Sequence, residues 1–370
     1  MELPIFLDHH ATTPCDPRVI EAMLPFFTEN FGNPAAITSA HGRRASTAVE
    51  DARIAVARFF GVLPPEIYFT AGATESNNIA LNLVRPGEHV VTSLIEHKSI
   101  VVPAERADVT FLKPDAEGFV DPDQLRDALR PNTKLVSIAW ANGEIGTIER
   151  IRELAAICRE RGVLIHSDAT QAVGKIPVDF SLLDLASLSA HKIYGPKGIG
   201  ALFVRRGTRM HPLIVGGGQE RNVRSGTVNV PGVIGLAAAL QLRAEEMDAE
   251  GLRLAALRDG LRNQLLATIP DVSINGPELR LPGNLNVSFD RIDAESLILA
   301  MKRFSLSTGS ACSAGERGPS RVLVACGVSE PRAMGSIRIG LGKSNTEEHT
   351  SLLAADLRRA VARLREITAA

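Results

Sequence analysis

Short apolar runs recur along residues 66–204, and their recurrence restricts the fold more than any other feature of the chain. The runs read EIYFT at 66–70, HVVTS at 89–93, KLVSIAW at 134–140, VLIHSD at 163–168, ASLSA at 186–190 and GALFV at 200–204. Helical stretches separate several of these runs, for example at 123–129 and 151–161. Strands that alternate with helices predict crossover units and an α/β fold with a mostly parallel sheet.

Helical patterns flank these runs. Residues 45–60 carry apolar residues at spacings of three and four, and this amphipathic pattern ends at Gly61. After residue 250 the sequence changes to longer helical patterns with one short strand near 285–289, and a last helix begins after Asn345.

The length of 370 residues predicts more than one core, because single cores rarely grow past about 250–300 residues. We expect a large domain at 15–250. A smaller α+β domain is expected from residues 1–14 together with 251–370, and it contains a loop rich in Gly and Ser at 307–318.

The charge balance limits the partners of the chain. With 41 Lys and Arg against 42 Asp and Glu, the formal net charge is −1, which speaks against direct binding to nucleic acid or to an anionic membrane. The N-terminal MELPIFLDHH has no basic region, and no apolar stretch is long enough to span a membrane, so we expect a cytoplasmic protein.

Cysteines are few and widely spaced. The four at 15, 158, 312 and 326 form no CxxC pair, so the sequence indicates neither a structural metal site nor a disulfide framework. Cys158 and Cys326 lie in apolar patterns and are expected to be packing residues. Cys312 differs because it lies in STGSACSAGERGPS among small and polar residues, where Arg317 and Arg321 could favour the thiolate.

Polar residues follow three of the predicted strands, at the edge of the sheet where α/β folds bind ligands. After the runs at 163–168 and 186–190 come two sets, Asp168 with Gln171 and Ser189 with His191 and Lys192. A third run, at 66–70, leads into Ala71-Gly72-Ala73-Thr74 and then a helix, whose free N–H groups suit a phosphate.

Each of these residues also has a purely structural interpretation. Asp168 alone could cap the next helix or bind a metal, and Lys192 alone could be a surface lysine that competes with Lys197. Together the three strand ends match the needs of pyridoxal phosphate: a phosphate anchor, an anion near the ring nitrogen and an amine for the aldehyde. His97 and Asn142 could then contact the ring, although a lone His is more often structural.

A series of segments, in order along the chain, resembles one family. They are FLDHHATTP, FGNPAA, AGATESNN, EHKSI, NGEIGT, HSDATQAVGK, SAHKIYGPKGIG, RSGTVN, STGSACS and SIRIGLG, and they cover almost the whole chain. The chain is similar to the NifS/IscS-like cysteine desulfurases, pyridoxal-phosphate enzymes of the class V aminotransferase family. This resemblance implies fold type I, with a seven-stranded, mostly parallel sheet in the large domain.

The resemblance also implies a role for each matched residue. Lys192 would hold the cofactor as a Schiff base and take the Cα proton, and Cys312 would attack the substrate sulfur. Asn33 and Arg338 would hold the substrate α-carboxylate. Cofactor contacts are implied for Asp168 at the ring nitrogen, Gln171 at the ring hydroxyl, His97 stacked on the ring as a catalytic residue, Asn142, the phosphate ligands Ala73, Thr74, Ser189 and His191, and Thr227 reaching the phosphate from the other subunit.

The implied reaction converts L-cysteine to L-alanine and leaves a persulfide on Cys312. A sulfur acceptor such as an iron–sulfur scaffold would take this sulfur, and Cys312 could hold an iron–sulfur cluster transiently. The reach of Thr227 into another subunit implies a homodimer.

Three positions depart from the family pattern: Gly143 replaces the second Asn of NNEIG, Ser39 replaces a His, and the cysteine loop reads SAGERGPS. Other functions stay open. The chain could be a selenocysteine lyase or a class V aminotransferase on the same fold, or a catalytically inactive interaction protein. An ATPase is disfavoured because GPKGIG and AGATES lack the GK[ST] ending of a nucleotide loop.

Overall fold

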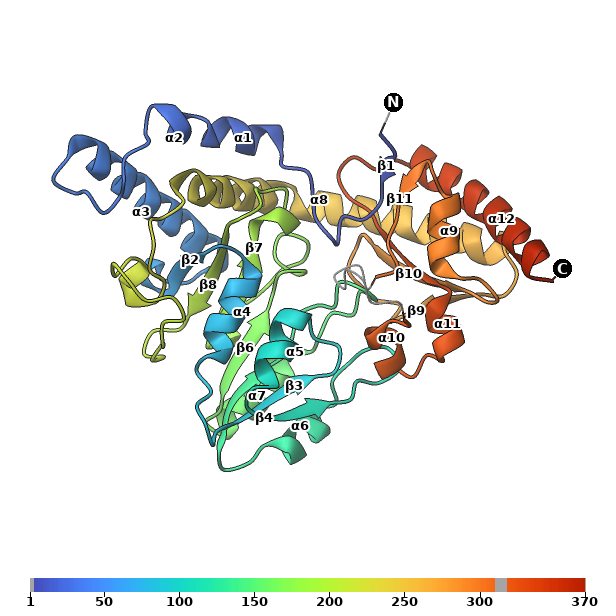
Figure 1. Ribbon diagram of the computed structural model, residues 1–370, viewed down its shortest axis with the longest axis horizontal. Helices are drawn as coiled ribbons and strands as arrows, with labels where there is room; N and C mark the ends of the chain where they lie inside the picture. Colours follow the sequence, from blue (N-terminus) through green and yellow to red (C-terminus); the bar gives the residue numbers. More distant parts are fainter. Residues whose placement is uncertain (1–2, 310–317, 370) are drawn as a thin grey trace.

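The computed structural model describes residues 3–309 and 318–369, which form three sheets surrounded by helices (Figure 1). The helices are α1 (Pro17–Met23), α2 (Pro25–Thr28), α3 (Ala40–Phe60), α4 (Ala73–Leu81), α5 (Lys98–Ala104), α6 (Pro122–Ala128), α7 (Ile151–Glu160), α8 (Val230–Thr268), α9 (Ala294–Ala300), α10 (Arg321–Ala325), α11 (Glu330–Met334) and α12 (Glu347–Ala369). Short 3₁₀ helices are η1 (Pro64–Glu66), η2 (Phe180–Leu182), η3 (Ala190–Lys192) and η4 (Glu220–Asn222). The strands are β1 (Ile5–Phe6), β2 (Ile67–Thr70), β3 (His89–Ser93), β4 (Asp108–Leu112), β5 (Thr133–Ser137), β6 (Leu164–Asp168), β7 (Leu185–Ser189), β8 (Gly200–Val204), β9 (Val272–Asn275), β10 (Asn284–Phe289), β11 (Phe304–Ser305) and β12 (Ser336–Gly340).

The main sheet has seven strands in the order β2-β8-β7-β6-β5-β3-β4. Neighbouring strands are parallel except around β8, which pairs antiparallel with both β2 and β7. Because β2 and β7 are antiparallel to the same strand, they point the same way. All strands but β8 therefore have their carboxyl ends at one edge, which confirms the predicted α/β fold with a mostly parallel seven-stranded sheet.

Helices cover both faces of this sheet (Figure 1), and the alternation of side chains along each strand explains why. On β8, Ala201 and Phe203 pack into one apolar core with α3, α7 and α8, whereas Leu202 and Val204 pack into another core with α4 and α5. All residues of β8 are buried, as expected for a strand covered on both faces.

Most predicted elements are present, with shifted ends. The helix predicted at 45–60 begins earlier, at Ala40, because Ser39 Oγ caps it by accepting a bond from Gly42 N at 3.0 Å. The strand predicted at 134–140 ends at Ser137. β4 and β9, both partly exposed edge strands, have no counterpart among the predicted runs.

A second apolar core surrounds the antiparallel sheet β12-β10-β9 and includes residues of α9 and α12. Leu7 of the N-terminal segment packs into this core as well. Helix α8 runs without a break through the predicted boundary at residue 250 (Figure 1). Its residues up to Leu240 pack into the main core and those from Leu254 onward into the second core. The division into two domains stays a prediction.

No helix within residues 3–309 and 318–369 is both long and apolar enough to cross a lipid bilayer.

Candidate functional site

A cavity of about 1240 Å³ lies at the edge of the main sheet where the parallel strands end. The structure brings most of the predicted site residues together here. Those that line the cavity are Ala73, Thr74, His97, Asn142, Asp168, Gln171, Ser189, His191, Lys192 and Arg338. They come from separate strand ends and turns, so the sheet topology is what collects them.

One end of the cavity contains the start of α4. Gly72 precedes the helix with a φ of 150° and has no side chain to cap it, so the N–H groups of Ala73 and Thr74 have no partner within the helix. Glu75 does not occupy this position, because its carboxylate accepts bonds from Ala71 N at 2.6 Å and Arg224 Nε at 2.9 Å. These N–H groups can therefore bind an anion in the cavity.

His191 lies beside this anion site and is uncharged at neutral pH. Burial and, after it, the charge of Lys192 lower the pKa of the imidazole to about 4. Its Nδ1 lies 3.1 Å from Thr12 Oγ1. The neutral ring can donate a hydrogen bond to a phosphate without adding a full charge.

Asp168, at the end of β6, is connected to His97 by a chain of hydrogen bonds. Its Oδ1 accepts a bond from Thr170 N at 3.0 Å and its Oδ2 from Asn77 Nδ2 at 2.8 Å. Asn77 Nδ2 also donates to Ser99 Oγ at 2.8 Å, and Ser99 Oγ lies 2.7 Å from His97 Nδ1.

A further hydrogen bond from Ser99 determines which nitrogen of His97 carries the proton. Ser99 donates its backbone N–H to His97 Nδ1 at 3.1 Å, so Nδ1 is an acceptor and the proton of the neutral ring lies on Nε2. Asn77 and Ser99 were not predicted as site residues. A signal was available in the sequence, because Asn77 follows Ala73 by one helical turn and Ser99 follows His97 by two residues.

Lys192 ends η3, and the N-terminal segment holds its side chain. Lys192 Nζ donates to the backbone carbonyls of His10 and Ala11, both at 2.6 Å. Thr13 of the same segment fixes the turn, because its N–H and its hydroxyl donate to His191 O at 2.8 and 3.0 Å. The N-terminal segment was predicted to join the second domain, but these contacts to Lys192 were not predicted.

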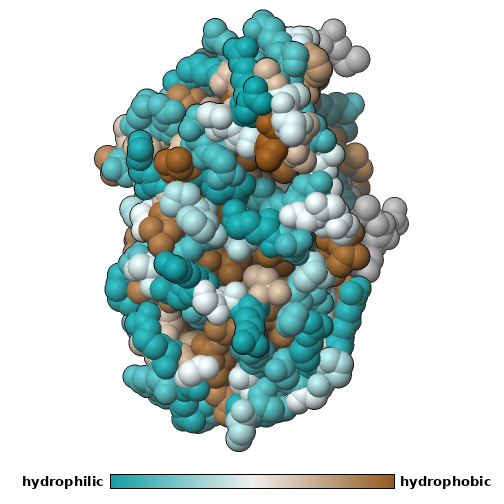
Figure 2. All heavy atoms as spheres, turned by 90° about the vertical axis from the view of Figure 1, so that its left-hand side faces the viewer, coloured by the Kyte–Doolittle hydropathy of each residue, from teal (hydrophilic) through white to brown (hydrophobic). Residues whose placement is uncertain are grey.

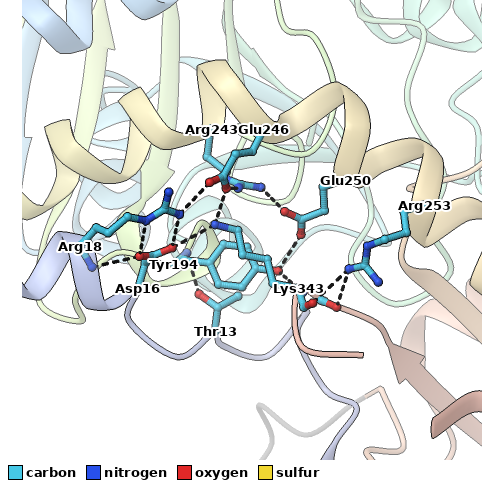
Figure 3. A network of polar contacts seen from close by, with 10 residues as sticks. Thr13, Asp16, Arg18, Tyr194, Arg243, Glu246, Glu250, Arg253 and Lys343 are labelled. Carbon is cyan, nitrogen blue, oxygen red and sulfur yellow. Dashed lines mark hydrogen bonds and ion pairs between the residues drawn. The ribbon is translucent and has the colours of Figure 1, made fainter. Parts of the chain in front are cut away.

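A polar network joins the Lys192 turn to two distant elements (Figure 3). Tyr194 has a φ of 64°, and its hydroxyl donates to Glu250 Oε1 of α8 at 2.9 Å and accepts from Lys343 N at 2.8 Å. Arg243 Nη1 donates to Glu250 Oε2 at 2.6 Å. Further ion pairs in the network involve Asp16, Arg18 and Glu246. The turn is thus tied to α8 and to the loop that follows β12.

Gln171 is held by the same N-terminal segment. Its Nε2 donates to His10 O at 3.0 Å, and its Oε1 accepts from Lys175 Nζ at 2.8 Å and lies 3.1 Å from His10 Nδ1. Because an amide oxygen only accepts, His10 Nδ1 carries a proton. Burial, and then the charge of Lys175, hold the pKa of His10 well below its usual value.

The departure at Gly143 has a steric consequence for Gln171. A Cβ at position 143 would stand 2.7 Å from Cδ and Nε2 of Gln171, so an Asn there would displace the Gln171 side chain. The neighbouring Asn142 shapes the turn, because its Oδ1 accepts from Glu144 N at 2.8 Å and its Nδ2 donates to Ile95 O at 3.1 Å.

Two of the predicted site residues lie away from the cavity within one chain. Asn33 and Thr227 are both exposed, and neither lines the cavity. The side-chain oxygen of Asn33 accepts a bond from Ala35 N at 3.0 Å. Arg338, the predicted partner of Asn33, does line the cavity. The roles of Asn33 and Thr227 stay predictions.

Cys312 and Arg317 lie outside the described residues. The described residues on either side of this segment, Gly309 and Gly318, both line the cavity. Arg321 donates to the backbone carbonyls of Leu94 and Glu96 and lines the cavity, and its expected effect on the thiol of Cys312 stays a prediction. As predicted, Cys158 and Cys326 are buried. Burial raises the pKa of each of these two thiols to about 12.

Known proteins similar to this chain cover its full length. A family model described as aminotransferase class-V matches residues 5–353. The chain belongs to this family. It is 46% identical to the cysteine desulfurase IscS of Anaeromyxobacter dehalogenans, with 100% of this chain and 95% of that protein covered. The cysteine desulfurase IscS of Dictyoglomus turgidum is also 46% identical, with 100% and 97% covered.

A solved structure of a NifS-like protein has the same fold. It superposes with a TM-score of 0.91 at 36% identity and covers 98% of this chain and 100% of that one. The likeness confirms the expected fold type I architecture and the expected resemblance to the NifS/IscS-like group.

Proposed function

We infer that the chain is a cysteine desulfurase, which removes sulfur from L-cysteine and releases L-alanine. The observation that carries this inference is the cavity at the strand ends, where the start of α4, Asp168, Lys192 and Arg338 line one space. The full-length similarity to two cysteine desulfurases supports the same activity.

We propose pyridoxal phosphate as the cofactor because the donor set of the cavity suits its three functional ends. The N–H groups that start α4 suit the phosphate, the carboxylate of Asp168 suits a protonated ring nitrogen, and the amine of Lys192 suits the aldehyde. When bound, this cofactor stabilises negative charge at the Cα atom of an amino acid.

The protein's own groups would perform the remaining tasks. Asp168 is oriented by Asn77 and Thr170, which leaves one lone pair on each oxygen for the ring nitrogen. His97 has its ring proton on Nε2 and faces the same cavity. Once released from its two carbonyl acceptors, Lys192 Nζ would accept the Cα proton, while Arg338 would hold the α-carboxylate.

We assign the nucleophile to Cys312. Its thiolate would attack the substrate sulfur while the bond between that sulfur and Cβ breaks, and the electron pair would pass to Cβ, which takes up a proton on the way to L-alanine. The sulfur would remain on Cys312 as a persulfide, and an acceptor such as an iron–sulfur scaffold would then take it. The flanking Gly309 and Gly318 line the cavity, which supports this assignment. Burial disfavours the thiolate at Cys158 and Cys326.

We also propose that the active form is a homodimer. The side of the molecule turned forward in Figure 2 carries scattered apolar residues over the α2 end of the fold. Exposed apolar side chains of residues 24–37 include Leu24 (57%), Phe27 (59%), Phe31 (64%) and Ile37 (63%), and Val215 (78%) of a separate segment is exposed as well. Leu213, of the same segment as Val215, also lines the cavity. A second copy packed against this surface would therefore lie next to the cavity of the first copy, and the first next to the cavity of the second. The exposed Thr227 would then reach the partner's cavity.

The test combines product analysis with two variants. Wild-type protein, supplied with L-cysteine and a reductant, is expected to release sulfide and alanine in equal amounts. Cys312→Ser should keep the absorbance of the bound cofactor at about 420 nm but lose roughly 100-fold or more in sulfide release, because the nucleophile is gone. Cys326→Ser is the matched control and should keep near wild-type turnover.

Two results would contradict the proposal. If wild type shows the cofactor band but releases no sulfide, the assignment to the family would stand and the desulfurase reaction would be excluded, as for an aminotransferase. Sulfide release by Cys312→Ser at the wild-type rate would remove Cys312 as the nucleophile. Lys192→Ala separately tests the cofactor site, and we expect this variant to lose the band on dialysis.

A further inference from the structure

The guanidinium of Arg338, which lines the cavity, is already paired with a buried carboxylate. Arg338 Nη2 lies 2.7 Å from Asp8 Oδ1, and the two side chains are only 8% and 13% exposed. Backbone bonds on both sides of Asp8 hold it in this place: Gly340 N donates to Leu7 O at 2.7 Å, and His9 N donates to Gly340 O at 3.0 Å. The Asp8–Arg338 pair is therefore fixed by the backbone pairing of the N-terminal segment with β12.

The other contacts of the guanidinium are neutral and longer. Nη2 also donates to Ser307 Oγ, and Nη1 donates to Gly143 O, both at 3.3 Å. Arg338 Nε is buried and makes no hydrogen bond within the described part of the chain. Arginine has five N–H donors, so the guanidinium can bind a further carboxylate while it stays paired with Asp8.

Asp8 is the carboxylate paired with Arg338 in a positively charged corner, where Glu250 acts on Lys175. Around His10, the cations that act on its imidazole are Lys175, Arg338 and Lys192. Glu144 lies within the electrostatic reach of Arg338, but burial raises the pKa of its carboxyl and Ser320 hydrogen-bonds to it. Asp8 is therefore the carboxylate that contacts Arg338 directly.

The affinity of Arg338 for an α-carboxylate affects the binding of substrate and of product alike. L-cysteine and L-alanine carry the same α-carboxylate, so an unshared guanidinium would hold both equally. Uniform binding of this kind does not accelerate the chemical step, and it slows the departure of the product. A carboxylate beside the arginine weakens the attraction for both molecules while keeping the guanidinium in place.

We propose that Asp8 sets the affinity of the cavity for the α-carboxylate by sharing the guanidinium of Arg338, and so keeps L-alanine binding weak. This proposal rests on the proposed role of Arg338 in the desulfurase. Asp8 acts through Arg338 and is a positioning residue; it does not itself contact the substrate.

Asp8→Asn tests this with little change of shape, because it can keep an acceptor oxygen toward Arg338 and replaces the other carboxylate oxygen by an uncharged amide NH2. Calorimetric titration of the cofactor-loaded full chain with L-alanine should give a dissociation constant about fivefold or more lower than that of wild type. The KM for L-cysteine should fall in the same direction, and kcat should not rise. Ser307→Ala removes a neutral contact to the same Nη2 and should leave both constants within about twofold.

The outcomes separate this proposal from the function on which it rests. Alanine binding in Asp8→Asn equal to or weaker than in wild type overturns the role of Asp8, provided wild type releases sulfide. If Asp8→Asn does not fold, Asp8→Glu and Asp8→Gln provide the same charge comparison, and equal alanine affinities overturn the proposal. A wild-type protein that neither releases sulfide nor binds alanine overturns the desulfurase function instead.

Discussion

Glu96 illustrates how burial controls a single residue at the cavity wall. Its side chain lines the cavity, and the residue is 3% exposed. Its Oε1 accepts a bond from Ala139 N at 2.9 Å, while Oε2 makes no hydrogen bond within the described residues. Burial raises the pKa of this carboxyl from 4.5 to about 8, against the opposing effect of the Ala139 bond. Glu96 is thus protonated at neutral pH.

This protonation predicts a pH-dependent stability. Between pH 4.5 and about 8 the unfolded chain has released this proton and the folded chain has kept it. The free energy of unfolding must therefore fall as the pH rises through this range. Glu96→Gln mimics the protonated acid and cannot titrate, so we expect it to be more stable than wild type at pH 9 by roughly a few kcal/mol.

Thermal unfolding of wild type and Glu96→Gln from pH 4 to pH 9 measures this difference. The two melting temperatures should converge near pH 4, where both side chains are uncharged. The same change at the exposed Glu295 of α9 serves as the control and should give parallel curves. A constant offset between wild type and Glu96→Gln at every pH would contradict the raised pKa.

At the scale of elements, close backbone packing forms the anion site at the start of α4. Strand β8 crosses next to this helix start, and its Gly200 leaves no room for a side chain. A Cβ on Gly200 would stand 2.4 Å from Leu188 O and 2.7 Å from Gly72 Cα. Both contacts are backbone atoms, which cannot move without shifting β7 or the turn before α4.

Gly200→Ala should therefore destabilise the protein by about 1–3 kcal/mol or more and weaken cofactor retention. Thermal unfolding and cofactor absorbance after dialysis measure the two effects. Gly260→Ala is the matched control, because Gly260 lies in the exposed part of α8 with nothing within 4 Å of an added Cβ. It should stabilise by about 0.5–1 kcal/mol through helix propensity. Equal stability of Gly200→Ala and wild type would contradict this prediction, because it would show that the turn before α4 can shift to accommodate a Cβ.

The elements were predictable where their pattern is local. The strands of the main sheet that are buried on both faces read as apolar runs, as β8 does in GALFV. β4 (DVTFL) was not predicted, although it carries more apolar residues than the predicted HVVTS run; it lies at the sheet edge and most of it is only partly buried. The continuity of α8 was also not predictable, because its two halves turn apolar faces toward different cores and so give no single helical pattern.

At the scale of the whole molecule, the position of the exposed apolar side chains makes the homodimer testable. Phe27 and Phe31 lie in and just after α2, at the opposite end of the molecule from α9 (Figure 1). Replacing both by Asp should convert the dimer to a monomer at micromolar concentration, because charges would enter the buried interface. Light scattering coupled to size exclusion measures the mass.

The control for the dimer test is Leu299→Asp, on α9, where Leu299 is 76% exposed. It should leave the mass unchanged. If Thr227 completes the partner's site, the monomeric variant should also retain less cofactor. A monomeric wild type, or a double variant with the wild-type mass, would contradict the proposed interface.

By itself, the sequence determined the alternation of strands and helices, and the polar residues that follow the strands. These features are local, so Asp168, Lys192 and the start of α4 could be assigned to one edge of a parallel sheet. Only the tertiary structure decided which groups hold them. Asp8 and Arg338 are separated by 330 positions, and Lys192 and His10 by 182. Such partners meet because the two cores pack around the N-terminal segment, and no local pattern encodes that meeting.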